Sequence, residues 1–188
     1  KITSYKLYGH GRATLKGIKK LTGWSSKGKD LWAKRDTSLP GLRYFQLSSL
    51  DPVRYKYFLN GIFINGERKQ VARTPNSGAF TTDGVAPDYV SYMNENDELT
   101  MTPDQYRGGY IYIHNEDFTG TKAEITGNTA SAFYFNKDDF YFYDLLSATN
   151  STTHKYAIMN HVNCADLDGE WTYDCHTRTI TLKHKTPP

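Results

Sequence analysis

The sequence predicts an all-β fold, an antiparallel β-sandwich or barrel-like domain with long loops and little helix. Short apolar runs recur along the 188 residues and are bounded by Gly, Asn and Pro, which is typical of strands joined by turns. Two of these runs are followed by Asn-Gly, at 60–61 and 65–66. This pair favours the type I′ hairpin turn, in which both central residues need φ > 0. Signals for helices are sparse by comparison.

Residues 1–76 are expected to form a flank that ends in a hairpin junction. The strands predicted in this part lie at 31–33, 42–47, 57–59 and 62–64. One helical turn is predicted at 48–54, because Ser49 can cap it. The strand-like segment that follows residue 57 is expected to end at Pro75, since proline has no N–H to donate to a strand ladder.

Residues 77–155 are expected to form an insert sandwich. Its first part, up to residue 105, is acidic and weakly patterned, which indicates mostly loop. The short strands expected there lie around 89–92 and 99–101. A stronger antiparallel meander follows, with strands predicted at 109–114, 121–126 and 130–135. In the first of these, alternation places Ile111 and Ile113 toward the core.

Residues 156–188 are expected to return the chain through one more hairpin, with strands at 170–174 and 179–182. The three parts together are interpreted as a single β domain over 1–188. Aromatic residues make up 14% of the chain, so rings can fill the core and still leave tyrosines for the surface.

The charge balance is mild, with a net charge of +3 and a pI near 8.7. No basic motif with interleaved aromatics is present, so no nucleic-acid partner is expected. No apolar run reaches the roughly 18 residues of a membrane span, so no membrane partner is expected either. The chain opens at Lys1 inside a strand-like run without a visible signal peptide, which suggests a processed piece of a longer protein.

No metal site and no cofactor are expected, because the sequence contains no CxxC or HExxH spacing and none of its six histidines pairs at metal-ligand spacing. The two cysteines, Cys164 and Cys175, leave two alternatives open. They could form one disulfide across a hairpin in an oxidising compartment. Otherwise they are two small thiols, at least one of them buried.

Three segments in order carry a family resemblance: YGHGRATLKGIKKLTGW at 8–24, FLNGIFINGERKQVARTPN at 58–76 and YAIMNHVNCADLDGEWTYDCHTRTITL at 156–182. The set resembles secreted bacterial right-handed parallel β-helix proteins, mostly glycoside hydrolases and polysaccharide-lyase-like proteins. In that group a β-sandwich insert lies between the second and third phrases, beside the β-helix. The resemblance implies that this chain is the insert with its flanks, and that the protein is secreted, periplasmic or at the cell surface.

The function that the resemblance implies is that of a non-catalytic carbohydrate-binding or accessory domain of a polysaccharide-degrading β-helix enzyme. Its partners would be a polysaccharide or oligosaccharide, neutral or anionic, and the β-helix domain of the parent protein. One alternative is a purely structural insert that braces the β-helix and shapes its active-site cleft. Another is a glycosidase or lyase fragment that uses paired carboxylates.

Sugar rings stack their apolar faces on exposed aromatic rings, and their hydroxyls need planar donors and acceptors. The candidate carbohydrate-binding residues are Tyr106, Arg107, Tyr110, Tyr112 and His114. The last three share the outward face of the 109–114 strand, and Arg107 would bind carboxylate or sulfate groups. The alternative is that the tyrosines form cross-strand pairs on a solvated face.

The densest carboxylate group is formed by Asp168, Glu170 and Asp174. Two carboxylates on one strand face could act as acid and base on a glycosidic bond. However, Glu170 and Asp174 lie beside expected turns, where carboxylates cap backbone N–H groups. Capping is therefore the favoured interpretation, and no catalytic residue is assigned.

Overall fold

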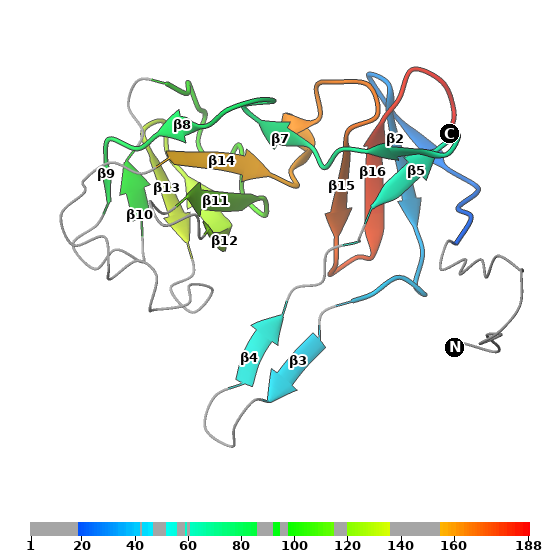
Figure 1. Ribbon diagram of the computed structural model, residues 1–188, viewed down its shortest axis with the longest axis horizontal. Helices are drawn as coiled ribbons and strands as arrows, with labels where there is room; N and C mark the ends of the chain where they lie inside the picture. The colour runs from blue at the N-terminus through cyan, green and yellow to red at the C-terminus, as the bar shows by residue number, and fades with distance from the viewer. Residues whose placement is uncertain are drawn as a thin grey trace, which may run out of the picture.

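The structure, a computed structural model, describes residues 19–41, 43–46, 52–55, 59, 61–85, 92–94, 98–114, 120–135 and 155–188. These residues form several antiparallel sheets, so the predicted all-β, sandwich-like fold is confirmed. Helix in the described part is limited to one 3-10 turn, η3, at Val162–Cys164. No described helix has the length and apolar character needed to cross a membrane. The strands gather in two lobes, each with its own sheet and core (Figure 1).

The larger lobe contains eight strands that pair in the order β7-β14-β11-β12-β13-β10-β9, with β8 also paired to β14. Their bounds are β7 Arg73–Thr74, β8 Phe80–Thr81, β9 Gly84–Val85, β10 Tyr92–Asn94, β11 Tyr110–His114, β12 Gly120–Asn128, β13 Ala132–Phe135 and β14 Lys155–Met159. Strands β11, β12 and β13 pair antiparallel in sequence order, so the predicted meander is confirmed.

Strand β12 curves the larger sheet, because it changes partners along its length. Residues 120–124 pair with β11, whereas the pairing with β13 covers 125–128 across a register shift between Ile125 and Gly127. A bulge of this kind bends a strand and increases its twist. The sheet therefore wraps around a core to which Ile111, Ile113 and Phe133 contribute fully buried side chains.

The smaller lobe contains a four-stranded sheet in the order β1-β2-β16-β15. Its strands are β1 Ser25–Gly28, β2 Leu31–Arg35, β15 Trp171–Asp174 and β16 Thr179–Lys183. One face buries Trp171, Tyr173, Ile180 and Leu182 in a separate core. The sequence prediction of a C-terminal hairpin is confirmed by the antiparallel register of β15 with β16.

Two further hairpins belong to the N-terminal part of the chain. Strand β3, Arg43–Gln46, pairs with β4, Pro52–Tyr55, and this hairpin extends away from both sheets (Figure 1). Strand β5, Ile62–Ile64, pairs with β6, Glu67–Lys69. Asn65 and Gly66 connect β5 and β6 with φ values of 52° and 86°, so the predicted Asn65-Gly66 turn is confirmed.

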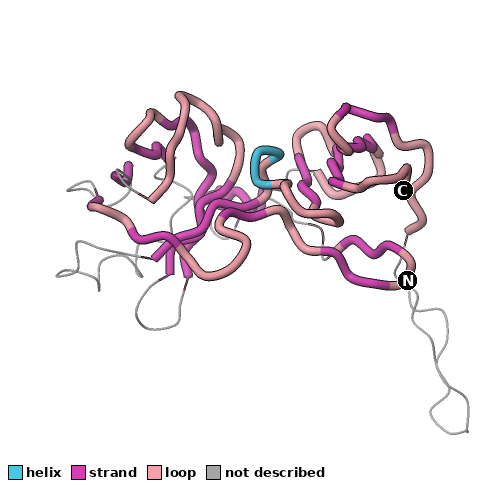
Figure 2. Tube along the Cα trace, turned by 90° about the horizontal axis from the view of Figure 1, so that it is seen from above, coloured by secondary structure: helices cyan, strands magenta, loops and turns pink. Residues whose placement is uncertain are grey.

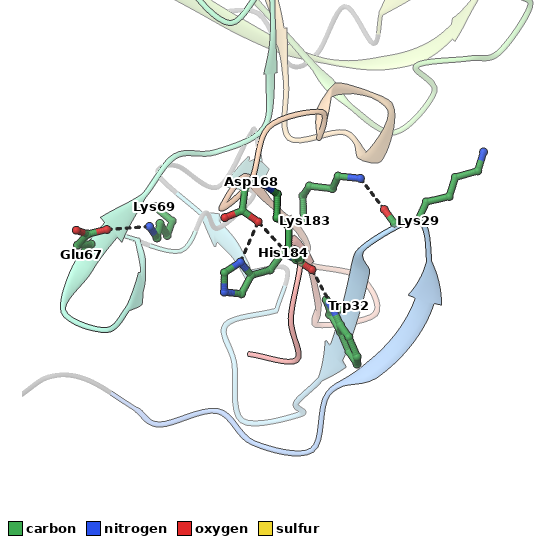
Figure 3. A network of polar contacts seen from close by, with 8 residues as sticks. Lys29, Trp32, Glu67, Lys69, Asp168, Lys183 and His184 are labelled. Atoms are coloured by element: carbon green, nitrogen blue, oxygen red, sulfur yellow. Dashed lines mark hydrogen bonds and ion pairs between the residues drawn. The ribbon is translucent and has the colours of Figure 1, made fainter.

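The C-terminal segment joins the hairpins of the smaller lobe through His184 (Figure 3). The His184 carbonyl accepts a hydrogen bond from Trp32 Nε1 at 2.9 Å, and its backbone N–H donates to Asp30 at 2.7 Å. Its ring Nδ1 lies 3.0 Å from Asp168 Oδ1. One residue thus links the β1–β2 hairpin to the turn before β15.

The two lobes meet at Ala72, which is fully buried. Its N–H donates to the Trp171 carbonyl in the smaller lobe at 2.8 Å, and its carbonyl accepts from the N–H of Asn160, just after β14, at 2.8 Å. The side chain of buried Asn160 crosses the same boundary. Its Nδ2 donates to the Tyr173 carbonyl at 2.9 Å, and its Oδ1 accepts from the Tyr173 N–H at 2.7 Å.

Several local predictions differ from the structure. The helical turn expected at 48–54 is wrong over 52–54, because these residues pair with β3 as strand β4. No strand forms at 99–101, whereas short strands β8 and β9 form in a segment predicted as loop. The predicted Asn60-Gly61 turn cannot be compared, because Asn60 lies outside the described residues. The same holds for residues 57–58 of the strand predicted at 57–59 and for residues 89–91 of the strand predicted at 89–92. The boundary predicted between the insert sandwich (77–155) and the return hairpin (156–188) falls at the start of β14.

The two cysteines are buried thiols, so the alternative without a disulfide describes the structure. Cys164, at 1% exposure, belongs to the core of the larger lobe, whereas Cys175, at 4%, belongs to that of the smaller lobe. Burial, and then the carboxylates of Glu170 and Asp166, raise the pKa of Cys164 to about 12.

We expect neither cysteine to react with a thiol reagent such as DTNB in the native protein, because the thiolate is the reactive form and both sulfurs lie in a core. Two thiols per chain should react once the protein is unfolded in guanidinium without reductant. Fewer than two under unfolding conditions would show that a disulfide forms after all.

We expect Asn160→Ala to destabilise the protein by about 2–4 kcal/mol, because it leaves both backbone groups of Tyr173 without partners at a buried site. Asn160 also has φ of 58°, so Asn160→Gly should be about 1 kcal/mol less destabilising than the Ala variant. Urea denaturation measures both. The control is Asn163→Ala on the neighbouring exposed turn, and equal losses in Asn160→Ala and this control would contradict the assignment.

Candidate functional site

A cleft of about 390 Å³ lies between the two lobes. Its lining comes from the turn before β11, from β11 and β12, from the η3 segment, and from the β15–β16 hairpin of the smaller lobe. The η3 turn lies between the two groups of strands (Figure 2). The residues that carry polar side chains into the lining are Arg107, Tyr110, Glu124, Asn160, His161, Thr172, Tyr173, Asp174, His176 and Thr181. A volume of this size is typical of small-ligand sites.

The wall contributed by the larger lobe follows from strand register. Tyr110 lies directly opposite Glu124 in the β11–β12 pair, so both side chains emerge on the same face of the sheet. Arg107 precedes β11 in a tight turn in which Gly108 adopts φ of 84°. The Arg107 side chain is 67% exposed, and its Nη1 lies 3.7 Å from Asp104 Oδ2. Its guanidinium can therefore turn to a ligand at little energetic cost.

The wall contributed by the smaller lobe is rich in hydroxyl groups. Thr172 pairs with Thr181 and Asp174 pairs with Thr179 across β15 and β16, so alternation places these side chains on the face opposite the core. A second, open hollow of about 450 Å³ covers this face and shares Thr172, Asp174 and Thr181 with the cleft. The two hollows therefore adjoin along these three residues.

His161 lines the cleft and is half-buried there. Its Nδ1 accepts a hydrogen bond from the Asn163 N–H at 3.2 Å, as the cap of η3. Its ring lies edge-on to Tyr106 at 5.8 Å between centroids. Burial lowers the pKa of His161. A hydrogen bond to the backbone of Arg107 raises this pKa by a smaller amount. Gly109 is required beside it, because a Cβ there would lie 2.9 Å from His161 Cβ.

The predicted binding residues do not form the exposed platform that the sequence suggested. Tyr106 is 4% exposed and packs in the core against Phe133, and burial raises its pKa. Tyr110 is 7% exposed, with Lys122 Nζ 5.9 Å from its ring centroid. The prediction that these two rings offer open stacking faces is therefore wrong, because neighbouring side chains cover both rings.

The remaining predicted binding residues are placed differently. Arg107 and Tyr110 both line the cleft, so these two candidates are brought together. Tyr112 is half-buried and does not line either hollow. His114 ends strand β11, and its side chain lies outside the described part. A binding role for any of the five stays a prediction.

The carboxylates near the C-terminus serve as caps and partners. Asp174 Oδ1 accepts from the His176 N–H at 2.8 Å, and its Oδ2 accepts from Thr177 Oγ1 at 2.6 Å. Glu170 Oε2 accepts from two backbone N–H groups, each at 2.9 Å. These contacts match the predicted capping role. In the described part, no three or more His, Cys, Asp or Glu side chains form a group that could hold a metal ion.

Sequence reasoning missed most of the cleft. Glu124 could have been found from the hairpin register, since it faces Tyr110 across the predicted meander. Asn160, Thr172 and Thr181 gave no such signal, because their position depends on how the two lobes are joined. The alternating threonines at 177, 179 and 181 are visible in the sequence, but the sequence does not show which surface they line.

The chain was compared with known proteins. No protein-family model matches it, and no curated protein matches it. Among solved structures, a protein titled "Glycoside hydrolase" has a similar fold, with a TM-score of 0.50 at 13% sequence identity. The match covers 87% of this chain and 28% of that protein, so this chain spans just over a quarter of its length. At this identity the likeness establishes shared fold.

We expect the stability of the protein to fall as pH decreases below about 6.5, where His161 begins to take up protons in the unfolded chain. The sign follows from the lowered pKa of His161 in the folded state, because the unfolded state then binds more protons. His161→Asn keeps an acceptor for the Asn163 N–H without titrating, and its stability should vary less between pH 7.5 and 5. Chemical denaturation at several pH values tests this, and parallel profiles for the two proteins would contradict it.

Proposed function

We propose that this chain is a non-catalytic, carbohydrate-binding module of a larger polysaccharide-degrading protein, and that a saccharide binds in the cleft between the two lobes. The observation that carries the proposal is the cleft lining, which combines a guanidinium, carboxyl and imidazole groups and threonine hydroxyls. Sugar recognition uses such planar donors and acceptors beside an apolar surface. Val162, 40% exposed at the cleft, supplies part of that apolar surface.

Two observations support a place in a larger carbohydrate-active protein. The protein with the similar fold is titled a glycoside hydrolase, and this chain corresponds to 28% of it. The three sequence phrases resemble the flanks of a β-sandwich insert in secreted β-helix enzymes. On this proposal the parent β-helix domain is the protein partner and the site of action is extracellular or periplasmic.

The surface formed by the two adjoining hollows suits a chain of sugars. The threonine face of β15 and β16 leads into the cleft through Thr172, Asp174 and Thr181. Hydroxyl groups at strand spacing can exchange hydrogen bonds with successive sugar hydroxyls. A polymer could therefore lie along this face with one residue inserted in the cleft.

The alternative is a purely structural insert, which would need a continuous apolar surface to pack on the β-helix. Among the described residues, the exposed large apolar side chains are Phe63, Tyr134, Val162 and Leu167. They come from β5, β13, η3 and the turn before β15, and only Val162 lines the cleft. This distribution favours the binding proposal.

The test is calorimetric titration of the full chain with neutral and uronic-acid plant and algal polysaccharides. We expect saturable binding that weakens about tenfold or more in Arg107→Ala and in His176→Ala, because each removes one polar group from an opposite wall of the cleft. Arg68→Ala on exposed strand β6, outside the cleft, is the matched control.

Wild-type affinity in both cleft variants would remove the cleft from consideration. Absence of binding to every polysaccharide would overturn the proposal in favour of the structural insert. Both cleft side chains are exposed in the structure, so these variants should fold normally, which circular dichroism and thermal unfolding would verify.

A further inference from the structure

Three buried polar atoms in the described part have no hydrogen-bond partner, and two of them are oxygens: Glu170 Oε1 and Asn76 Oδ1. Both belong to one small cluster. Glu170 is only 3% exposed, and its other oxygen accepts from the backbone N–H groups of Asp166 and Leu167. Asn76 Nδ2 donates to Asp166 Oδ1 at 3.0 Å, which orients the orphan Oδ1 of the same amide. Asp166 thus contacts both residues that carry an orphan oxygen.

The cluster is electrostatically unbalanced. Glu170 Oε2 accepts a hydrogen bond from the backbone N–H of Asp166 at 2.9 Å, which brings the two acidic residues together. Among the described residues, neither forms an ion pair with Lys, Arg or His. The third buried atom without a partner is Arg73 Nε, and the guanidinium of this residue donates through Nη2 to the Gly78 carbonyl at 2.7 Å. Two adjacent carboxylates, one of them buried, need a positive charge or a proton to be stable.

We propose that Asp166, Glu170 and Asn76 form a binding site for a hard divalent cation, with Ca²⁺ as the best fit. Carboxylate and amide oxygens are the ligands that Ca²⁺ prefers, and its flexible coordination accepts one buried and one exposed carboxylate with waters completing the shell. Asp166 is exposed, so solvent can reach the site and supply those waters. The orphan oxygens of Glu170 and Asn76 gain their missing partner in the cation.

The position of the site gives the cation a structural role. Asn76 follows β7 and lies 90 residues before Asp166 in the chain. Asp166 and Glu170 lie in the segment that leads from η3 in the larger lobe to β15 in the smaller lobe. A cation here would therefore clip together the two chain segments near the lobe boundary, and clips that close long loops stabilise a fold most. No sequence motif predicts this site, because Asn76 lies 90 residues before Asp166.

Burial raises the pKa of Glu170, and the neighbouring Asp166 charge adds to this effect against the two backbone hydrogen bonds. A proton on Glu170 is thus the competing way to relieve the repulsion. The two states differ in their response to Ca²⁺ and to removal of the Glu170 charge, which allows one experiment to separate them.

The experiment uses the full chain after treatment with a chelator. Calorimetric titration with CaCl₂ and thermal unfolding in CaCl₂ or EDTA are measured on wild type, Glu170→Gln and Asp166→Asn. For wild type we expect one Ca²⁺ per chain and a rise in Tm of about 5–10 °C at 100-fold excess over Kd. Both variants should bind Ca²⁺ at least about tenfold more weakly, and Glu170→Gln should be more stable than wild type in EDTA because the repulsion is gone.

Asp168→Asn is the matched control, because Asp168 lies in the same turn but its carboxylate contacts His184. This variant should keep the wild-type response to Ca²⁺. A wild-type Tm that does not respond to Ca²⁺, or a response that persists in both Glu170→Gln and Asp166→Asn, would overturn the proposal. If the wild-type Tm does not respond to Ca²⁺, equal stability of Glu170→Gln and wild type in EDTA at pH 7 would show that a proton on Glu170 relieves the repulsion instead.

Discussion

The reciprocal hydrogen bonds between the Asn160 side chain and the Tyr173 backbone are the constraint on which the rest of the molecule depends. An amide side chain is suited to this role, because it supplies one donor and one acceptor side by side, as a peptide group does. Asn160 therefore acts as an added rung that connects the end of β14 to β15. In a buried setting these bonds are strong and an unmade one is costly, so the arrangement specifies how the two sheets meet.

The cleft is a direct result of this junction. Its two walls belong to different sheets, and neither sheet alone forms a cavity with these residues. Asn160 is both part of the cleft lining and part of the joint that sets the distance between the walls. Affinity at the cleft and stability of the junction are therefore linked, and any ligand that bridges the walls also stabilises the contact between lobes.

The parts that could be predicted from the sequence are the ones determined locally. Alternation correctly assigned Ile111 and Ile113 to the core, and Asn65-Gly66 identified its turn, because both depend on neighbouring residues. The helical turn predicted at 48–54 is wrong over 52–54, because pairing with β3 outweighed a local capping signal.

Long-range features escaped prediction for the same physical reason. The burial of Tyr110 depends on side chains from other strands, and the separation of Cys164 from Cys175 depends on the chain having two cores. The grouping of Asn76 with Asp166 joins positions 90 residues apart. Periodicity and spacing carry no information about such contacts, so the candidate site could be assembled only once the lobes were placed together.

The parallel bridge between Val71 and Trp171 places the two ends of the larger lobe side by side. The chain leaves the smaller lobe after residue 71 and re-enters it at residue 171, so the intervening hundred or so positions form one loop whose ends already touch. The entropy of closing a loop grows only with the logarithm of its length, by about 0.6 kcal/mol per doubling. The smaller lobe could therefore accept inserts of very different size at this point, provided that an exchanged lobe again supplies the hydrogen bonds that Ala72 and Asn160 make with Trp171 and Tyr173.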